Sequence, residues 1–138
     1  MLDLTSLAKA IEQLKKSYAY SHSSLAKEDA ELFFQFRAAT IQAFEYTYQL
    51  SVKMLQRQLE DMSEIPEDIE KQAYKEMIRT GAEKGLIDDP VTWFTFREKR
   101  NITSHTYDEE KAEAVYDIIE SFIAKAESLY QKIYEKNS

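Results

Sequence analysis

The chain has 138 residues, 43% of them hydrophobic, and a net charge of −7 at pH 7. This length fits one domain with a real core, and the acidic balance argues against a broadly basic nucleic-acid-binding surface, because many Lys and Arg normally neutralise phosphates in such proteins. The absence of Cys excludes disulfides and Cys-ligated metal centres. With only two Gly and two Pro, long uninterrupted helices are expected. We therefore predict a single all-α domain over residues 1–138.

The beginning of the chain argues against export. Met1 is followed by an amphipathic rather than an apolar stretch, which predicts no signal peptide. No apolar run approaches the roughly 18 residues needed to span a bilayer. We expect a cytoplasmic protein without membrane contact.

The first two predicted helices are separated by a polar loop. Apolar residues recur at helical spacing until the serine-rich residues 21–24 interrupt them. A long helix follows from about Asp29 to Asp61, where no Gly or Pro intervenes. Four glutamines recur every seven residues along one side of it, opposite an apolar arc of about 200°. So broad an arc predicts more than one packing neighbour, and a homodimer would cover its exposed part, including Phe33 and Phe36.

Three further helices complete the predicted bundle. Pro66 stands where a third helix can begin, and Gly85 is suited to end it. Asp89 and Pro90 are typical of an N-cap followed by the first residue of a fourth helix. Asp108 can cap a last helix, whose apolar residues form one continuous seam. Short connections make these five helices mostly antiparallel.

Residues 100–107, hereafter the motif segment, contain more side chains able to bind phosphate or transfer protons than any other stretch of the sequence. They read Arg-Asn-Ile-Thr-Ser-His-Thr-Tyr and hold one of the two histidines. Arginine can bind the non-bridging oxygens of a phosphodiester, and histidine can carry a proton near neutral pH. Arg100 and His105 are therefore candidate catalytic residues. The alternative is a capping or surface role, because a cation near a helix C-terminus is favoured by the helix dipole.

Helical geometry limits how Arg100 and His105 can cooperate. In a continuous α-helix, five residues turn two side chains about 140° apart and separate them by about 7.5 Å along the axis. The two side chains could then not share one phosphate. Either the helix ends or kinks near residues 102–104, or two copies of the chain contribute to one composite site.

Arg37 is a further candidate, found from periodicity alone. On a helical wheel it lies on the apolar, packed side of the long helix. A buried arginine needs a partner. Glu45, or a residue of the motif segment, is expected to meet Arg37 or Arg100. The alternative is that Arg37 extends along a groove to reach solvent.

Together these residues resemble a known family. The pattern Arg-x4-His-x-Tyr lies at the junction of the last two helices of a small acidic bundle and is similar to the motif of the HEPN fold. The residues that match this motif are Arg100, Asn101, His105 and Tyr107. Residues 31–55 and 85–93 resemble proteins described as nucleotidyltransferase substrate-binding subunits. The resemblance covers nearly the whole chain and implies a HEPN-like four-helix bundle core.

The resemblance also implies a partner and a reaction. Members of this branch are encoded beside a minimal nucleotidyltransferase and form a toxin–antitoxin pair with it. In the family picture the HEPN protein is a metal-independent ribonuclease, which the nucleotidyltransferase silences by transferring AMP to the motif tyrosine; no cofactor is expected. Carried over, Arg100 would stabilise charge on the phosphate and His105 would be the general base or acid. Asn101 would hold the local turn or a phosphate oxygen, and Tyr107 would be the modification site.

Two other functions stay open at this point. The chain could be a noncatalytic subunit that presents a nucleotide or another substrate to the nucleotidyltransferase, with Arg100 and His105 as phosphate ligands only. It could also be a plain helical dimer whose motif is vestigial. Tyr107, likewise, could be a hydrophobic staple that packs against the following helix.

Overall fold

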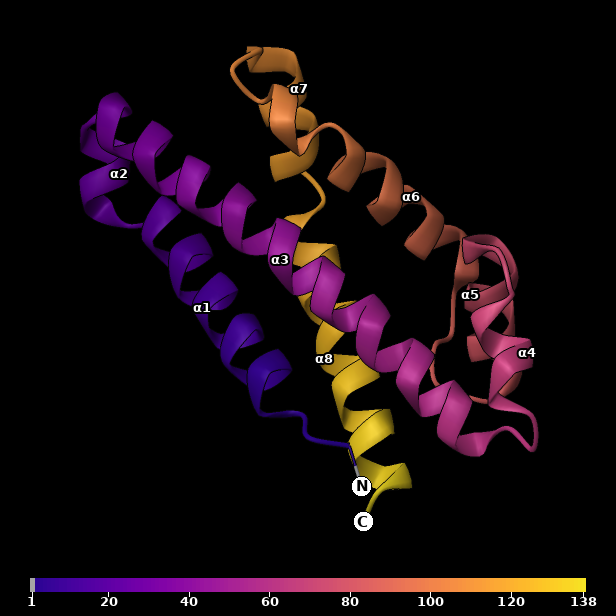
Figure 1. Ribbon diagram of the computed structural model, residues 1–138. Coiled ribbons are helices and arrows are strands. Elements are labelled where there is room, and N and C mark those ends of the chain that lie inside the picture. The colour runs from indigo at the N-terminus through magenta and orange to yellow at the C-terminus, as the bar shows by residue number, and fades with distance from the viewer. Residues whose placement is uncertain (1) are drawn as a thin grey trace.

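The computed structural model describes residues 2–138, and every regular element in that range is helical (Figure 1). Met1, on which the expectation about a signal peptide depends, lies outside the described residues. In chain order the elements are α1 (Thr5–Ser21), α2 (Ser24–Glu28), α3 (Ala30–Met62), α4 (Pro66–Glu70), α5 (Tyr74–Glu83), α6 (Pro90–Asn101), the 3-10 turn η1 (Thr103–His105), α7 (Glu109–Tyr116) and α8 (Ile119–Lys136). The prediction of an all-α bundle is confirmed.

The long helix α3 is the axis of the fold. Its N-terminus is capped by the carboxylate of Asp29, which accepts hydrogen bonds from the backbone N–H groups of Glu31 and Leu32. Without Gly or Pro to stop it, the helix continues to Met62, as the periodicity predicts. Figure 1 shows α1 and α8 packed alongside α3, while α6 approaches it from the other side.

Aromatic side chains join α3, α6 and α8 in the core. Phe122 of α8 is fully buried, and its ring lies edge-on to Phe44 of α3 and to Phe96 of α6, with centroid distances of 4.9 and 5.1 Å. Such edge-to-face pairs add to the free energy of burying apolar area. The helix that leads into the motif segment is therefore held firmly against two others.

The predicted third helix is divided into α4 and α5. Pro66 begins α4 as expected, but a turn separates α4 from Tyr74, where α5 starts. The predicted C-terminal glycine is confirmed, since Gly85 has φ +79°. The N–H groups of Gly85 and Leu86 bond to the carbonyls of Ala82 and Gly81, at 3.1 and 2.9 Å, in a Schellman arrangement.

The predicted last helix is also divided, into α7 and α8. At the junction the N–H of Ile118 bonds to the carbonyl of Val115, three rather than four residues back, at 3.2 Å. The flanking Val115 and Ile119 are both fully buried, so the apolar seam continues across the break. That continuity explains why hydrophobic periodicity predicts one helix here.

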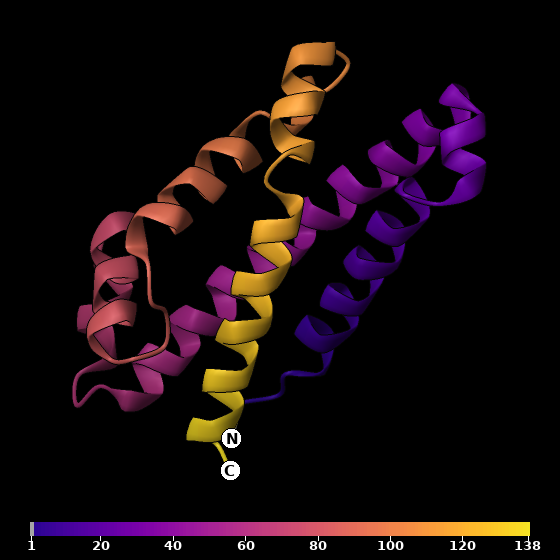
Figure 2. The same ribbon diagram turned by 180° about the vertical axis from the view of Figure 1, so that it is seen from behind.

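The two termini lie together at one end of the bundle, and α2 and α7 lie at the other (Figure 2). The Asn137 side chain joins the termini: its Oδ1 accepts from the N–H of Leu2 at 3.4 Å, and its Nδ2 donates to Gln58 at 2.8 Å. Among residues 2–138, no helix is long and apolar enough to cross a membrane.

Candidate functional site

The motif segment begins in the last turn of α6 and then leaves the helix. α6 ends at Asn101, and the N–H of Ile102 already bonds three residues back, to Lys99 at 3.2 Å. The turn η1 follows, closed by a hydrogen bond from the N–H of His105 to Ile102 at 3.0 Å. The end of the helix near residues 102–104, one of the two arrangements that the sequence left open, is observed. Arg100 and His105 therefore lie on different elements at the same end of the molecule.

Thr103 attaches this turn to the middle of α3. Its hydroxyl lies 2.7 Å from Oε2 of Glu45 and 2.8 Å from the carbonyl oxygen of Arg100, so its single proton can serve either acceptor. The Thr103 side chain is buried. The amide of Asn101 is exposed and makes no hydrogen bond within residues 2–138, so Thr103 rather than Asn101 holds the turn.

Arg37 attaches the other end of the loop. It is buried, and its two terminal nitrogens donate to the two carboxylate oxygens of Glu109 at 2.8 and 2.7 Å. Its guanidinium also lies over the ring of Phe34, 5.0 Å from the centroid. Hydrogen bonds from Arg37 hold the pKa of Glu109 below its ordinary value. Because Glu109 is the first residue of α7, this ion pair joins the start of α7 to α3.

The expectation that Glu45 pairs with Arg37 or Arg100 is wrong. Within residues 2–138, Glu45 forms no salt bridge with either arginine, and its hydrogen-bond partner is Thr103. About 12 Å of helix separates Arg37 from Glu45 along α3. The loop, by contrast, brings α7 back to the N-terminal half of α3, where Arg37 lies. The prediction that Arg37 lies on the packed side and needs a partner is confirmed.

Between the two anchors the chain projects into solvent. His105 is exposed, and the Tyr107 side chain is 86% exposed. Their rings lie edge to face, with centroids 6.1 Å apart. So exposed a tyrosine is not packed against α7, which excludes the hydrophobic staple. His22, the other histidine, instead caps α1, with Nδ1 at 2.9 Å from the carbonyl of Tyr18.

Arg100 is the one half-buried cation of the motif segment. Its Nε is buried and has no hydrogen-bond partner within residues 2–138. The salt bridges of that range involve Lys15, Lys16, Arg37 and Lys125, and Arg100 takes part in none of them. A buried donor without an acceptor is unfavourable by about 1–3 kcal/mol. The terminal nitrogens of Arg100, which are not buried and form no hydrogen bond within residues 2–138, are the atoms that an anion can reach.

Residues 2–135 match the model of a family described as nucleotidyltransferase substrate binding protein like. The chain belongs to this family. Over 100 residues it is also 42% identical to the probable ribonuclease HepT of Haemophilus influenzae, a match that covers 72% of this chain and 68% of the relative. The resemblance to HepT-like proteins is confirmed.

Solved structures agree with this family membership. One from Haemophilus influenzae, described as the fold of a substrate binding domain of a nucleotidyltransferase, superposes with a TM-score of 0.90 at 34% identity, over 96% of this chain and 99% of the other. A crystal structure from Thermus thermophilus superposes with a TM-score of 0.70 at 26% identity, over 92% and 98% of the two chains.

Two residues, one that supports the motif segment and one that supports α6, could not be found from the sequence. Glu109 is one of several acidic residues around α7, so its sequence context does not single it out. The only signal was that a buried Arg37 needs an acidic or polar partner. Tyr74 accepts a hydrogen bond from the Tyr48 hydroxyl at 2.6 Å and donates to the backbone carbonyl of Trp93 at 3.1 Å. Tyrosine hydroxyls that are shielded from solvent usually find hydrogen-bond partners, but nothing in the sequence shows which partners Tyr74 has.

Proposed function

We propose that this HepT-like chain is a metal-independent endoribonuclease. Arg100 supports the proposal most directly: a half-buried guanidinium whose Nε lacks an acceptor lies at the end of α6, in the same motif segment as the exposed His105. A non-bridging phosphate oxygen of RNA would accept from that guanidinium. The charge that develops on the phosphorus substituents during transfer would then be stabilised by a positioned cation.

His105 would move the protons of the reaction. Attack by the RNA 2′-hydroxyl on the adjacent phosphorus forms a 2′,3′-cyclic phosphate and breaks the bond to the 5′-oxygen, which leaves as a hydroxyl. One imidazole accepts the 2′-hydroxyl proton, and a protonated imidazole donates to the leaving oxygen. Both roles are filled at once if a homodimer brings two copies of His105 to one composite site. Phe33 and Phe36, which were expected to be exposed, are half-buried against other rings of the chain. The exposed residues are Leu25 on α2 and Phe34 in the first turns of α3, and they are suited to such an interface.

Cleavage tests this proposal. Purified protein is incubated with RNA in excess EDTA, and products are resolved by gel electrophoresis. We expect cleavage by the wild type, loss of cleavage in His105→Ala, and full activity in the matched control His22→Ala. Equal cleavage by His105→Ala and the wild type would exclude His105 from the chemistry.

We further propose that a minimal nucleotidyltransferase is the partner and antitoxin of this chain in the cytoplasm, and that it silences the chain by transferring AMP to Tyr107. The phenol is 86% exposed, so a second active site can reach it. In the transfer, the Tyr107 oxygen bonds to the α-phosphorus of ATP, pyrophosphate leaves, and the phenolic proton is released. The attached AMP places a phosphate and a bulky nucleoside on the motif segment, where they compete with RNA for Arg100.

Intact-mass measurement tests the modification. The chain is co-expressed with the partner nucleotidyltransferase, and a mass increase of one or more AMP units is expected. The increase should vanish in Tyr107→Phe and persist in Tyr134→Phe, which removes another exposed tyrosine on α8. An AMP increment that survives Tyr107→Phe assigns the modification elsewhere.

A second candidate function is a noncatalytic subunit that binds a nucleotide for the nucleotidyltransferase. The net charge of −7 favours it over free RNA binding. The solved relative described as a nucleotidyltransferase substrate binding domain points the same way. Under this alternative, fresh unmodified protein does not cut RNA, while Arg100→Gln weakens binding of a nucleotide measured by calorimetry.

A further inference from the structure

Three cations on α5 and α6 lie over aromatic rings. Lys75 and Arg79, one turn apart on α5, both lie over the ring of Phe94, with charged atoms 5.2 and 5.4 Å from its centroid. Arg97 of α6 lies over the ring of Tyr74, 4.4 Å from its centroid. We call Lys75, Arg79 and Arg97 the basic strip.

The basic strip continues to the motif segment. Arg97 and Arg100 are three residues apart on α6, which places them one turn apart, about 4.5 Å along the axis. Both also lie near Tyr48: burial raises the pKa of that phenol, and the charges of the two arginines oppose the rise. Figure 1 shows that α6 runs from α5 to the motif end of the bundle. A row of positive charge thus follows α6 to Arg100.

These charges are not neutralised by carboxylates. The salt bridges within residues 2–138 leave out all three residues of the basic strip as well as Arg100. Contact with a ring holds the long side chain in place and leaves its N–H groups free to donate. Many other cations of the chain also lie outside salt bridges, but within residues 2–138 only Lys75, Arg79 and Arg97 combine that freedom with contact to an aromatic ring.

We propose that the basic strip binds the phosphate backbone of single-stranded RNA next to the phosphate held at Arg100. The inference rests on the proposed ribonuclease function. A phosphodiester bound at Arg100 belongs to a chain of phosphates, and its neighbour comes within reach of Arg97. The row is short, about 9 Å along α6 from Phe94 to Arg100. That length suits a few consecutive phosphates of one strand better than the roughly 16 base pairs that duplex-binding domains contact.

Salt-dependent binding tests the strip separately from catalysis. The background is His105→Ala, so that the probe stays intact, and the probe is a fluorescein-labelled single-stranded RNA of mixed sequence, followed by fluorescence anisotropy. The strip variant carries Lys75→Gln, Arg79→Gln and Arg97→Gln, which keep aliphatic stems over the rings.

The control variant removes three exposed cations from α1 and the solvent side of α3: Lys9→Gln, Lys53→Gln and Arg57→Gln. Both variants lose the same total charge, so only the position of the lost charge differs. Thermal unfolding midpoints check that both stay folded, and Arg79→Gln alone is measured as well, in case the triple variant unfolds.

The strip variant is expected to bind the probe at least about tenfold more weakly than its parent at low salt, and the slope of log K against log salt should fall by about 2. Arg79→Gln alone should lower the slope by about 0.7. The control variant should keep the slope of the parent. Equal losses in the strip and control variants overturn the proposal.

Other outcomes are equally decisive. If the strip variant binds RNA like its parent but no longer co-purifies with the nucleotidyltransferase, the strip is a protein-docking surface and the proposal is overturned. If strip-dependent binding persists in a protein that does not cut RNA, the ribonuclease assignment fails and the RNA contact stands. If RNA is cut while the strip variant binds like the parent, the ribonuclease assignment stands and the strip proposal fails.

Discussion

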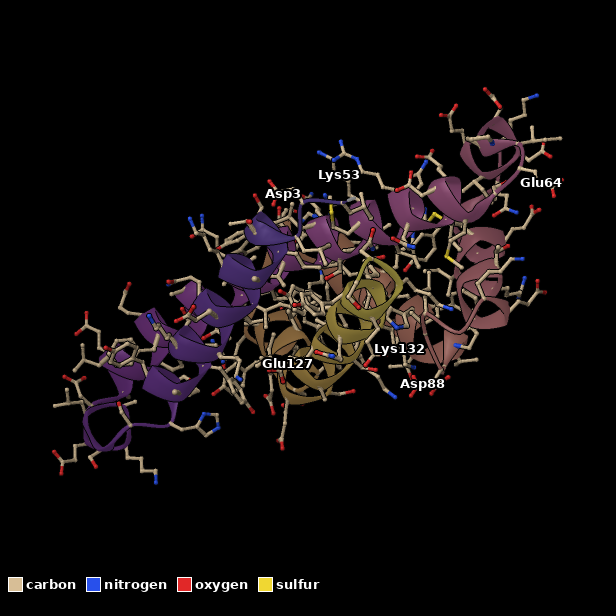
Figure 3. All side chains as sticks on the ribbon, turned by 90° about the horizontal axis from the view of Figure 1, so that it is seen from below. Asp3, Lys53, Glu64, Asp88, Glu127 and Lys132 are labelled. Atoms are coloured by element: carbon tan, nitrogen blue, oxygen red, sulfur yellow. The ribbon has the colours of Figure 1, made fainter. Side chains whose placement is uncertain are left out.

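Cations on two pairs of helices in this bundle have different kinds of partner. On α1 and α8, two cations are paired with carboxylates: Lys15 bonds to Glu127 at 2.9 Å, and Lys125 bonds at 3.3 Å to Asp88 in the loop between α5 and α6. Figure 3 shows Glu127 on α8 and Asp88 next to the chain between α5 and α6. On the α5–α6 side the cations lie on aromatic rings or, at Arg100, have no partner. Paired charges are neutralised, whereas the others remain available to an anion.

The motif end combines firm support with free reactive groups. Thr103 and Glu109 hold the two ends of the loop on α3, while His105 and Tyr107 between them are exposed. A site that must bind and release a substrate needs both properties, because the support fixes the geometry and the exposed groups stay accessible. Lys15 and Lys125, by contrast, have carboxylate partners within the chain and are not expected to contribute to cleavage.

The largest expected effect is that of Arg100→Gln on cleavage. Removal of a positioned cation from a developing charge typically lowers the rate by about 10²–10³-fold. The thermal unfolding midpoint should stay near that of the wild type, because Arg100 has no bonded partner to lose within residues 2–138. Initial rates of RNA cleavage measure the effect, with Lys15→Gln as the control from the paired side. A large fall in the midpoint would instead make Arg100 a structural residue.

Arg37→Met removes the anchor at the start of α7. Two short hydrogen bonds to Glu109 are lost, and the motif segment loses one of its two attachments. We expect the thermal midpoint to fall by about 4 °C, and the cleavage rate to fall by about tenfold through misplacement of the loop. Lys15→Met breaks an exposed ion pair and should change neither property measurably. Calorimetry and cleavage assays compare the two variants; equal behaviour would show that Arg37 does not position the loop.

Thr103→Val removes the other anchor without changing the shape of the side chain. The Glu45 carboxylate and the Arg100 carbonyl then lose their shared donor, which should lower the free energy of unfolding by about 1 kcal/mol. Urea denaturation measures the loss. Thr103→Ser keeps the hydroxyl and should restore most of it; a Ser variant as unstable as the Val variant would assign the effect to packing.

The smallest expected effect is a pH dependence of the Arg37 anchor. Arg37 lowers the pKa of Glu109 below its ordinary value of 4.5, so the pair stabilises the fold above that pH, and the stabilisation is lost as the pH falls through the lowered value. The difference in unfolding midpoint between the wild type and Glu109→Gln should therefore shrink between pH 7 and pH 3. Glu110→Gln, at the exposed neighbouring position, should show no such change. A difference that persists at pH 3 would contradict this linkage.

Features encoded within a few residues could be predicted. The Asp89 and Asp108 caps and the glycine at 85 follow from local backbone rules, and the structure bears them out. The breaks between α4 and α5 and between α7 and α8 could not be predicted, because no Gly or Pro marks them and, at the second, the apolar seam continues across the break. For the site, the sequence singled out Arg100, His105, Tyr107 and Arg37, and it named the wrong partner for Arg37.

By itself, the sequence determined the all-α class, the packed side of α3 and the set of residues in the motif segment, since each depends on composition, periodicity or neighbouring residues. Tertiary structure alone decided which distant groups meet. Arg37 and Glu109 are 72 positions apart, and Glu45 and Thr103 are 58 apart. Their contacts depend on the angles and register at which whole helices pack, which no local pattern records. The same packing leaves Arg100 without a partner, and that is the feature on which the proposed function depends.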